Sequence, residues 1–398
     1  MKRPIVIIGA NEFQNRLILR AKALGFETHV FAWLEGAVGR ETADYFYPIS
    51  IAEREEILTQ CEKIAPVAVT SVASDLAVPT VSYICQKLRL PGNSVACASA
   101  STNKYLMRQC FLQAGVSTPG FARVTSSRDC AVDFKFPLIV KPTDRSGSRG
   151  VTKVFTSDAL KQAVEACIAV SFEKAAIIEE FIEGEEFSAE YISFGGCHHF
   201  LTVTKKFTTG APHFIETGHV QPAALPEPVL ARVRAEIEKG LDALGIQNGA
   251  SHPEFKISKD GSVHLIEIGA RMGGDCIGSD LVPLSTGYDF LKMVIDTACG
   301  LPPEILPVEQ PRCAAIRFIF GQSDLALLEH VRREAPATLY RSYLSEPVFA
   351  HAVTDSSTRF GYFILTAHDK PRILRLAGFD DNPPVPANAA AFVCGCDR

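Results

Sequence analysis

The sequence lacks the short motifs that mark several common kinds of binding site. Twelve cysteines are scattered along the chain without any Cys-x-x-Cys pair, and only Cys394 and Cys396 are closely spaced. This spacing indicates neither a zinc framework nor a disulfide scaffold, so we expect reduced thiols and a cytoplasmic protein. The pattern Gly-x-x-x-x-Gly-Lys-Ser/Thr is also absent, which excludes a P-loop nucleotide-binding protein.

Long apolar runs and an excess of positive charge are missing as well. No stretch approaches the roughly 20 apolar residues that a membrane span requires. The net charge of −5 provides no excess of positive charge that would attract nucleic acid or an anionic membrane. Lys2 and Arg3 precede an apolar run, but PIVIIGA is too short for the core of a signal peptide. We therefore expect a protein that binds neither nucleic acid nor membrane and carries no secretion signal.

What is present is the composition of an ordinary globular enzyme. With 398 residues, of which 47% are hydrophobic and 21% charged, the chain is long enough for two or three domains. It opens with a β-α-β pattern: an apolar strand at 4–8, a helix ending near Gly25, and a strand at 28–32. The loop 9–11 is typical of a ligand-facing turn. It departs from Gly-x-Gly-x-x-Gly, so an NAD-dependent dehydrogenase stays a minor alternative.

The stretch from Ser251 to Asp275, SHPEFKISKDGSVHLIEIGARMGGD, organises the rest of the chain. Its Asp260-Gly261 pair predicts a two-residue hairpin turn, in which paired residues sum to 521. Glu254 then lies directly opposite Glu267 on one face. Like charges facing each other destabilise a sheet, so the pair predicts a cation between them, with Mg²⁺ as the natural candidate. The alternative is a pair of solvated glutamates on an edge hairpin.

Two lysines belong to this interpretation. Lys104 lies in the first turn of a helix predicted at 101–115, capped by Ser101 or Thr102, where its charge opposes the helix dipole unless it reaches an anion. Lys141 ends an apolar strand, and a glycine-rich loop at 144–150 follows it. The small residues of such a loop let backbone N–H groups approach a phosphate. A solvated surface lysine is the alternative for Lys104.

The remaining segments predict further parts of a site and its scaffold. The strand-like run 175–192 carries Glu179, Glu180 and Glu186 among apolar residues, which suits an adenine and ribose slot but equally a solvated rim. Asp75 is interpreted as a helix N-cap, and 202–219 as loop-rich. Further predictions are helices at 76–88, 163–175, 227–244 and 281–300, strands at 313–320, 347–353 and 361–367, and a loose tail after 380.

Taken in order, these pieces resemble the ATP-grasp superfamily of carboxylate-amine ligases. The resemblance rests on four elements: Lys104, Lys141 with its loop, the strand EEFIEGEEF, and the Glu254/Glu267 hairpin. It is closest to L-amino acid ligases and short carbamoyl-phosphate-synthase-like chains in KKFTTGAPHFIETGH and EIGARMGGD. It implies an α/β and α+β fold with four parts: a Rossmann-like domain (1–100), an ATP-grasp domain (101–305), its mobile lid subdomain (about 118–185), and a small β-rich C-terminal domain (306–398).

The resemblance also implies roles for individual residues. The residues expected to bind the phosphates, adenine and ribose of ATP are Lys104, Lys141, Ser146, Gly147, Ser148, Glu179, Glu180, Phe181, Ile182 and Glu186. Glu254 and Glu267 are expected to bind Mg²⁺, which Mn²⁺ could replace. Arg271 is expected to bind the transferred phosphoryl group or the substrate carboxylate. Candidate substrate residues are Lys205, His219 and Arg317 for a carboxylate, and Glu216 or Asp275 for an amine. One departure is Gly269, where the family pattern Glu-x-Asn-x-Arg has an amide, and His252 or Asp275 is a candidate replacement through water.

The implied reaction joins a carboxylate to an amine through an acyl phosphate, with release of ADP and phosphate. The expected partners are a small-molecule carboxylic acid and an amine, with dipeptide formation as one form of the reaction, and a homodimer as the assembly. Three alternatives stay open: an ATP-grasp carboxylase or formyl-transferring enzyme, a kinase that stops at phosphoryl transfer, and a nucleotide-binding pseudoenzyme permitted by Gly269.

Overall fold

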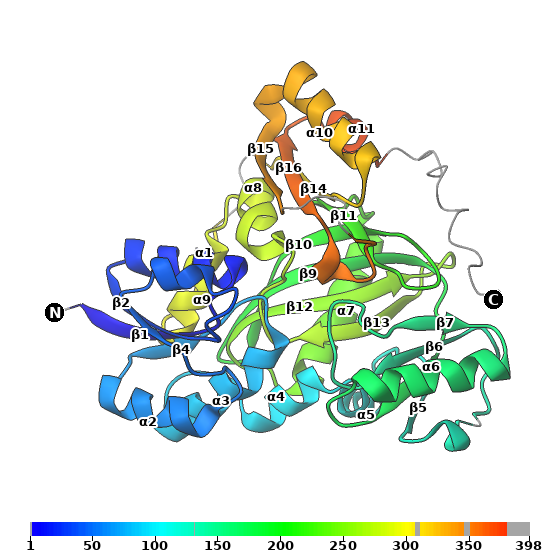
Figure 1. The fold of residues 1–398 in the computed structure, drawn as a ribbon, viewed down its shortest axis with the longest axis horizontal. Coiled ribbons are helices and arrows are strands. Elements are labelled where there is room, and N and C mark those ends of the chain that lie inside the picture. The colour runs from blue at the N-terminus through cyan, green and yellow to red at the C-terminus, as the bar shows by residue number, and fades with distance from the viewer. Residues whose placement is uncertain (1, 131, 307–310, 346–350, 380–398) are drawn as a thin grey trace.

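The computed structural model describes residues 2–130, 132–306, 311–345 and 351–379. In Figure 1 the N-terminal part lies at the left, a small lid at the lower right and the C-terminal part at the top, with a large sheet between them. Within the described residues, no helix is both long and apolar enough to cross a membrane.

The N-terminal part is a parallel sheet with helices packed against it. Its strand order is β3-β2-β1-β4, and its buried strands are the apolar runs expected of a covered parallel sheet. Asn11 caps the first helix through its side chain. The elements are β1 (Arg3–Ile8), α1 (Glu12–Ala23), β2 (Phe26–Phe31), β3 (Tyr45–Tyr47), α2 (Arg54–Ile64), β4 (Ala68–Thr70) and α3 (Val78–Leu88), with single turns η1 (Val38–Glu41) and η2 (Asp75–Ala77).

Two helices lead from this part to the lid. The helix predicted within 101–115 is present as α5 (Lys104–Ala114), and Gly115 is its C-cap as predicted. Its N-cap is Asn103, because Ser101 and Thr102 belong to a preceding helix, α4 (Val95–Thr102). The lid is an antiparallel sheet of order β5-β8-β6-β7 covered by one helix. Its elements are β5 (Phe121–Val124), η3 (Ser127–Asp129), β6 (Leu138–Pro142), β7 (Thr152–Val154), α6 (Ser157–Val170) and β8 (Ala176–Glu180).

The large sheet has eight strands in the order β13-β12-β9-β10-β11-β14-β16-β15, all antiparallel. Its first five are β9 (Glu185–Phe194), β10 (Cys197–Thr208), β11 (Glu216–Gln221), β12 (Gly249–Ile257) and β13 (Val263–Gly269). The segment 202–219, predicted as loop-rich, therefore lies mostly in β10 and β11. The run 175–192, predicted as one strand, is divided between the lid and this sheet.

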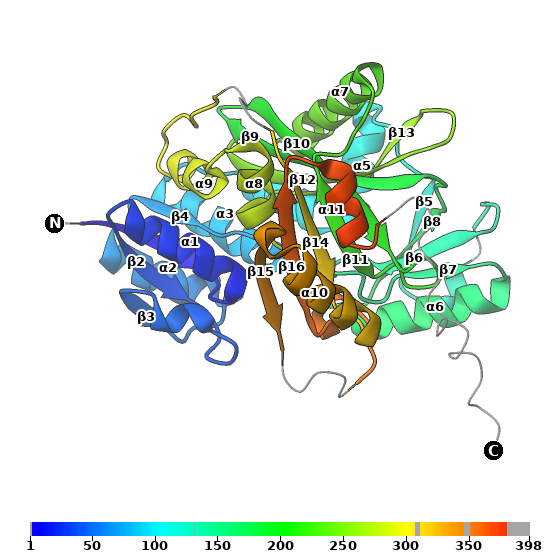
Figure 2. The same ribbon diagram turned by 90° about the horizontal axis from the view of Figure 1, so that it is seen from above.

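The C-terminal strands continue the same sheet instead of forming a sheet of their own. They are β14 (Cys313–Phe318), β15 (Leu339–Leu344) and β16 (Gly361–Ala367), and they pack against α10 (Gln322–Glu334) and α11 (Lys370–Leu376), as Figure 2 shows from above. Single turns are η5 (Pro336–Thr338) and η6 (Ser356–Thr358). The prediction of a strand at 347–353 is wrong for 351–353, and 347–350 lie outside the described residues, as does the tail after 379.

Three further helix predictions meet different outcomes. The helix at 227–244 is confirmed as α7 (Glu227–Leu244), and that at 76–88 as α3 preceded by η2. The helix predicted at 281–300 is wrong as a single element. It is divided into a π-turn η4 (Ile277–Leu281), α8 (Val282–Thr286) and α9 (Phe290–Ala298), because Gly287 ends α8 in the left-handed conformation.

The two faces of the large sheet differ in polarity, and this difference determines where the site lies. Alternate side chains of a strand point to opposite faces. On one face, Phe187, Val203 and Phe255 pack against α5 and α7 in a buried apolar cluster. The opposite face carries Glu186, Glu190, Lys206, His252 and Glu254, which interact with one another. A polar face this extensive, with charged side chains no more than 25% exposed, indicates a binding site.

Candidate active site

The Glu254/Glu267 pair predicted from the hairpin is present. Glu254 pairs with Glu267 and His252 with Gly269 between β12 and β13. The turn itself was predicted wrongly. Ser258 and Ser262 are hydrogen-bonded across a three-residue loop that ends with Gly261 at φ +81°. A β-bulge lies between the pairs Phe255–Leu265 and Glu254–Glu267, with one extra residue on β13. The bulge offsets the longer turn, so Glu254 pairs with Glu267 as predicted.

Cationic side chains surround both carboxylates. Lys104 Nζ lies 3.2 Å from the carboxylate of Glu267. Lys206 Nζ lies 3.0 Å from Glu254 Oε2 and within 3.6 Å of the carboxylates of Glu186 and Glu216. Burial alone would lower the pKa of Lys206, but these three carboxylates raise it, so the amine is charged. The helix-start position of Lys104 is thus explained, because the side chain reaches an anion.

The two carboxylates fit a magnesium ion carried by a nucleotide better than a closed metal site. Within the described residues, no group of three His, Cys, Asp and Glu side chains could hold a metal alone. Magnesium is commonly held by one or two carboxylates, with water and phosphate oxygens completing the octahedron. Glu254 and Glu267 supply these hard oxygens side by side. The His252 ring contacts the carboxylate of Glu190, which raises its pKa to about 9 against the effect of burial. A contact between His252 and the metal through water stays a prediction.

A buried ion triad fixes the second lysine. Lys141 Nζ and Arg108 Nε each lie 2.7 Å from a different oxygen of Glu179. All three side chains are almost fully buried. Burial opposes ionisation of Glu179, but Arg108 and Lys141 together lower its pKa to about 2. Both oxygens of Glu179 are occupied in this way, so its side chain holds Lys141 in position and is not free to contact an adenine as the sequence predicted.

The glycine-rich loop covers a cavity next to Lys104. A cavity of about 230 Å³ is lined by Asp75, Lys104, Arg145, Ser146, Phe172 and Glu267 among others. Lys104 Nζ donates to the carbonyl oxygen of Arg145 at 2.6 Å, which ties the loop to the helix. Gly147 and Ser148 both have positive φ, and Ser148 Oγ donates to the carbonyl of Phe214. The loop therefore spans from the lid to the β10–β11 connection above the polar face.

Arg271 makes a two-point ion pair that the sequence did not predict. Its Nε and Nη2 donate to the two oxygens of Asp75 at 2.9 and 3.0 Å. Asp75 was interpreted as an N-cap, but the N-cap is Ser74 and the carboxylate binds Arg271 instead. Gly269 makes room for this arrangement, because a Cβ there would lie 3.0 Å from Arg271 Cζ. Burial opposes the charge of Arg271, while Asp75 raises its pKa.

The predicted adenine slot has an aromatic wall with two lysines on it. Lys153 Nζ lies 3.4 Å and Lys256 Nζ 4.7 Å from the ring centre of Phe181, and Phe214 packs 5.9 Å away. Lys256 also donates to the carbonyl of Ile182 at 3.3 Å. Glu180 is turned outward, where it accepts from the Gly120 N–H. Glu186 stays on the polar face near Lys206.

The substrate candidates are divided by the structure. His219, Glu216 and Asp275 lie together on or beside the polar face. Lys205 lies on the opposite face of β10, where it pairs with Glu185 and stacks on Phe187. Arg317 is paired with Asp324. Asp275, proposed as a water-mediated metal contact, is instead bound by Arg359, whose Nη2 lies 2.6 Å from its Oδ1.

Four functional candidates escaped the sequence analysis: Asp75 as an ion partner, Arg108, Lys206 and Arg359. Strand alternation could have found Lys206, because it shares the face of Glu186 in β9 and Lys205 does not. Nothing local marks the others. Arg108 and Arg359 meet partners 71 and 84 positions away in the chain, and Asp75 meets one 196 positions away.

Comparisons with known proteins show what the chain and its fold are similar to. The ATP-grasp domain family matches residues 134–280. Alanine-anticapsin ligase of Bacillus subtilis (strain 168) is 28% identical over 295 residues, which make up 65% of this chain and 62% of that protein. D-alanine-D-alanine ligase of Cupriavidus metallidurans is 27% identical over 245 residues, or 58% of this chain and 73% of that one. The chain spans 62% to 66% of the length of three alanine-anticapsin ligases that it matches.

A solved structure matches almost the whole fold. The L-amino acid ligase from Bacillus licheniformis superposes with a TM-score of 0.80 and 25% identity, covering 94% of this chain and 96% of that one. The match includes the N-terminal parallel sheet, the lid and the large antiparallel sheet, since these make up the described chain.

Proposed function

Because this chain is an ATP-grasp domain protein, we propose that it is an ATP-dependent ligase that joins an amino acid, through its carboxylate, to the amine of a second amino acid. Its similarity to alanine-anticapsin ligase and to L-amino acid ligase supports this class of substrate. The free cysteines among the described residues agree with a cytoplasmic location.

The phosphate end of the proposed ATP site is the cavity beneath the glycine-rich loop. Lys104 and Lys141 supply two ammonium groups, and both are held by carboxylates that can share them with phosphate oxygens. Glu254 and Glu267 would hold Mg²⁺, which when bound neutralises phosphate charge and orients the γ-phosphate. Phe181, Ile182 and Glu186 would contact the adenosine.

The proposed reaction has two steps. A carboxylate oxygen of the first substrate attacks the γ-phosphorus in line, the bond to the β-phosphate oxygen breaks, and ADP leaves. The amine nitrogen of the second substrate then attacks the acyl carbon, the bond to the phosphate oxygen breaks, and phosphate leaves. Lys104, Lys141 and Arg271 act through position and charge, which account for most of the catalysis in phosphoryl transfer. The loop at 144–150 would exclude water that hydrolyses the acyl phosphate.

Arg271 and Asp75 suit the first substrate. Arg271 lies close enough to Glu254 and Glu267 for both to raise its pKa, so an anion bound to it lies near the proposed magnesium position. Its Nη1 is buried and makes no hydrogen bond to any residue that the structure describes. This N–H group can donate a hydrogen bond to the carboxylate that is to be activated. Asp75 can bind the ammonium group of the same amino acid.

The observation that carries the proposal is the Glu254/Glu267 pair, of which Glu267 lies with Lys104 on the wall of a cavity that the glycine-rich loop also lines. The test is a matrix of the twenty amino acids taken in pairs with Mg·ATP, scored for ADP and for the ligated product by mass spectrometry. We expect ADP release to require two amino acids, and Glu267→Gln to abolish it. Product formed with bicarbonate alone, a stable phosphorylated product, or nucleotide binding without turnover over the whole matrix would contradict the proposal.

A further inference from the structure

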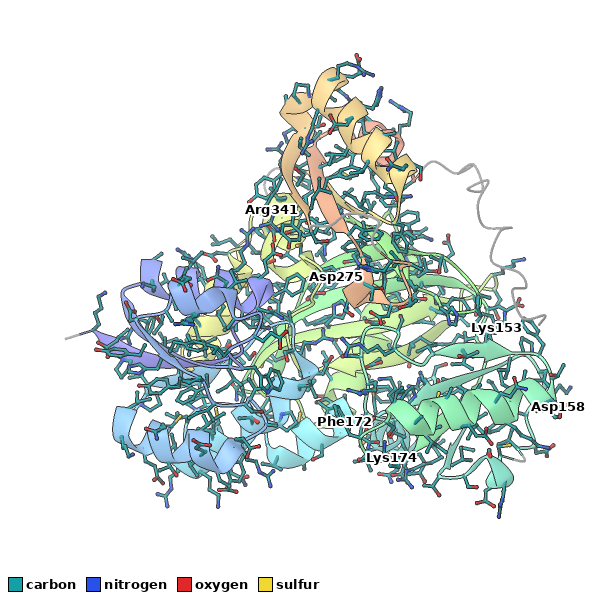
Figure 3. The ribbon with its side chains drawn as sticks, in the orientation of Figure 1. Lys153, Asp158, Phe172, Lys174, Asp275 and Arg341 are labelled. Atoms are coloured by element: carbon teal, nitrogen blue, oxygen red, sulfur yellow. The ribbon has the colours of Figure 1, made fainter. Side chains whose placement is uncertain are left out.

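A second, largely buried arginine-aspartate pair lies beside the proposed active site. Arg359 Nη2 donates to Asp275 Oδ1 at 2.6 Å, and the guanidinium lies 3.6 Å from the ring centre of Phe318. The Arg359 side chain is only 8% exposed. Figure 3 labels Asp275 near the C-terminal strands of the large sheet. The pair therefore brings the C-terminal part of the chain into contact with the residues that follow β13.

The backbone that carries this carboxylate is unusual. Asp275 and Cys276 have φ of +52° and +62°, two consecutive left-handed residues without a glycine. Such a conformation costs on the order of 1–3 kcal/mol per residue and persists only where the surroundings enforce it. Strain of this kind is concentrated at binding sites, and here it directs Asp275 toward Arg359 and His219.

His219 adds an unused polar atom to the same cluster. Its Nε2 lies 3.7 Å from Asp275 Oδ2, and its ring is 1% exposed. Its Nδ1 is buried and makes no hydrogen bond within the described part of the chain. Burial lowers the pKa of this histidine, so the ring is neutral. A neutral imidazole has one nitrogen that can accept a hydrogen bond.

The cluster is continuous with the proposed metal and phosphate site. Arg359 Nη1 donates to the backbone carbonyl of Glu216 at 3.4 Å. The carboxylate of Glu216 lies 3.6 Å from Lys206, and Lys206 lies 3.0 Å from Glu254. A molecule bound at Arg359 would thus be separated from Glu254, one of the proposed magnesium ligands, by two side chains, those of Glu216 and Lys206. The C-terminal loop that provides Arg359 also provides Ser356, whose Oγ donates to Glu216 at 2.6 Å.

We propose that Asp275, Arg359 and His219 form the subsite for the amine substrate, and that Arg359 makes this subsite selective for acceptors that carry an α-carboxylate. This inference rests on the proposed function. Arg359 binds the carboxylate of the acceptor amino acid, and Asp275 with His219 binds its amino group.

The charge balance favours an amino acid over a simple amine. The Arg359–Asp275 pair has no net charge, and leaving one member of a buried pair uncompensated is strongly unfavourable. An amino acid brings one positive and one negative group, so it can replace both halves of the pair at once. An amine without a carboxylate would bind Asp275 and leave Arg359 buried and unpaired. Arg317, which the sequence analysis named as a candidate for binding the substrate carboxylate, is held by Asp324.

The test compares acids with amides as acceptors. Initial rates of the full-length enzyme are measured with the twenty amino acids and their carboxamides as acceptors, for wild type, Arg359→Ala, Arg359→Lys and the control Arg341→Ala. Arg341 is a matched control, because it also lies in the C-terminal part, pairs with the buried Asp280 and stacks on Tyr362.

We expect wild type to prefer acids and Arg359→Ala to lose about 10- to 100-fold in kcat/KM for acids, the size of a hydrogen bond to a charged group. Carboxamide rates and the KM for ATP should change less than threefold, and Arg359→Lys should recover part of the acid preference. Arg341→Ala should keep the preference even if it unfolds at lower temperature. Equal use of acids and amides by wild type, or an equal loss for both in Arg359→Ala, would overturn the inference. Absence of any ligated product would instead overturn the proposed function.

Discussion

Replacing Glu179 with Gln should weaken the lid and loosen its hold on Lys141. The carboxylate is shared by Arg108 and Lys141 at 2.7 Å each, and its pKa is lowered from the usual 4.5 to about 2. At about 1.4 kcal/mol per pKa unit, ionised Glu179 contributes about 3 kcal/mol at pH 7. This agrees with the loss of about 3–5 kcal/mol expected when a buried ion pair loses one partner.

The sign of the pH dependence follows from the lowered pKa. A carboxylate whose folded pKa lies below its unfolded value contributes its full stability above the unfolded pKa, here 4.5, and loses it as the pH falls through about 2. The stability difference between wild type and Glu179→Gln should therefore be constant near neutral pH and shrink between about pH 5 and pH 2.

Amide hydrogen exchange of β6 and β8 measures the stability of the lid strands themselves. This local measurement is preferable to global unfolding, because a chain of several domains need not unfold in one step. A loss of about 3 kcal/mol corresponds to exchange about 100-fold faster in the variant. Glu180→Gln is the control, since the neighbouring Glu180 carboxylate is exposed and, among the described residues, accepts a hydrogen bond only from the Gly120 N–H. This variant should change exchange only slightly. The KM for ATP should rise in Glu179→Gln alone. Equal exchange rates in the two variants would refute the reasoning.

The other predictions concern single side chains. Lys206→Met should reduce kcat/KM at least 100-fold while Lys205→Met changes it less than threefold, because only Lys206 lies on the polar face; similar kinetics for both would contradict this assignment. Gly269→Ala should displace Arg271, since the added Cβ lies 3.0 Å from its Cζ, and so lower kcat about tenfold with a melting temperature close to that of wild type; unchanged kcat would argue against the role of Arg271. Gly218→Ala should lower the melting temperature markedly, since its Cβ would lie 2.3 Å from a backbone oxygen, and calorimetry showing an unchanged transition would contradict this packing.

The parts of the fold that were predictable are those set by local patterns. The apolar run at 4–8 and the helix at 227–244 follow from periodicity and capping, which act over a few residues. The Glu254/Glu267 pairing was predicted with the wrong turn, because a longer loop and a bulge offset each other. The helix predicted at 281–300 was wrong because an apolar pattern continues through Gly287, where the backbone turns away.

The parts that were not predictable depend on contacts between distant segments. The sequence around Asp75 is typical of a helix start, and only the structure shows that its carboxylate binds Arg271. Likewise, nothing near Arg359 in the sequence indicates that its partner is Asp275. The C-terminal strands gave no sign of joining the large sheet, since β14 pairs with β11 across more than ninety intervening residues. The choice between Lys205 and Lys206 needed only the correct assignment of β10 as a strand.

Transfer of ¹⁸O tests the central claim most directly. The protein is incubated with Mg·ATP, an acceptor amino acid and a first amino acid labelled with ¹⁸O in both carboxylate oxygens, and the released phosphate is analysed by mass spectrometry. Attack of that carboxylate on the γ-phosphorus predicts one ¹⁸O atom in each phosphate formed, and retention of the other in the new amide. Unlabelled phosphate accompanied by ligated product would contradict the acyl phosphate route.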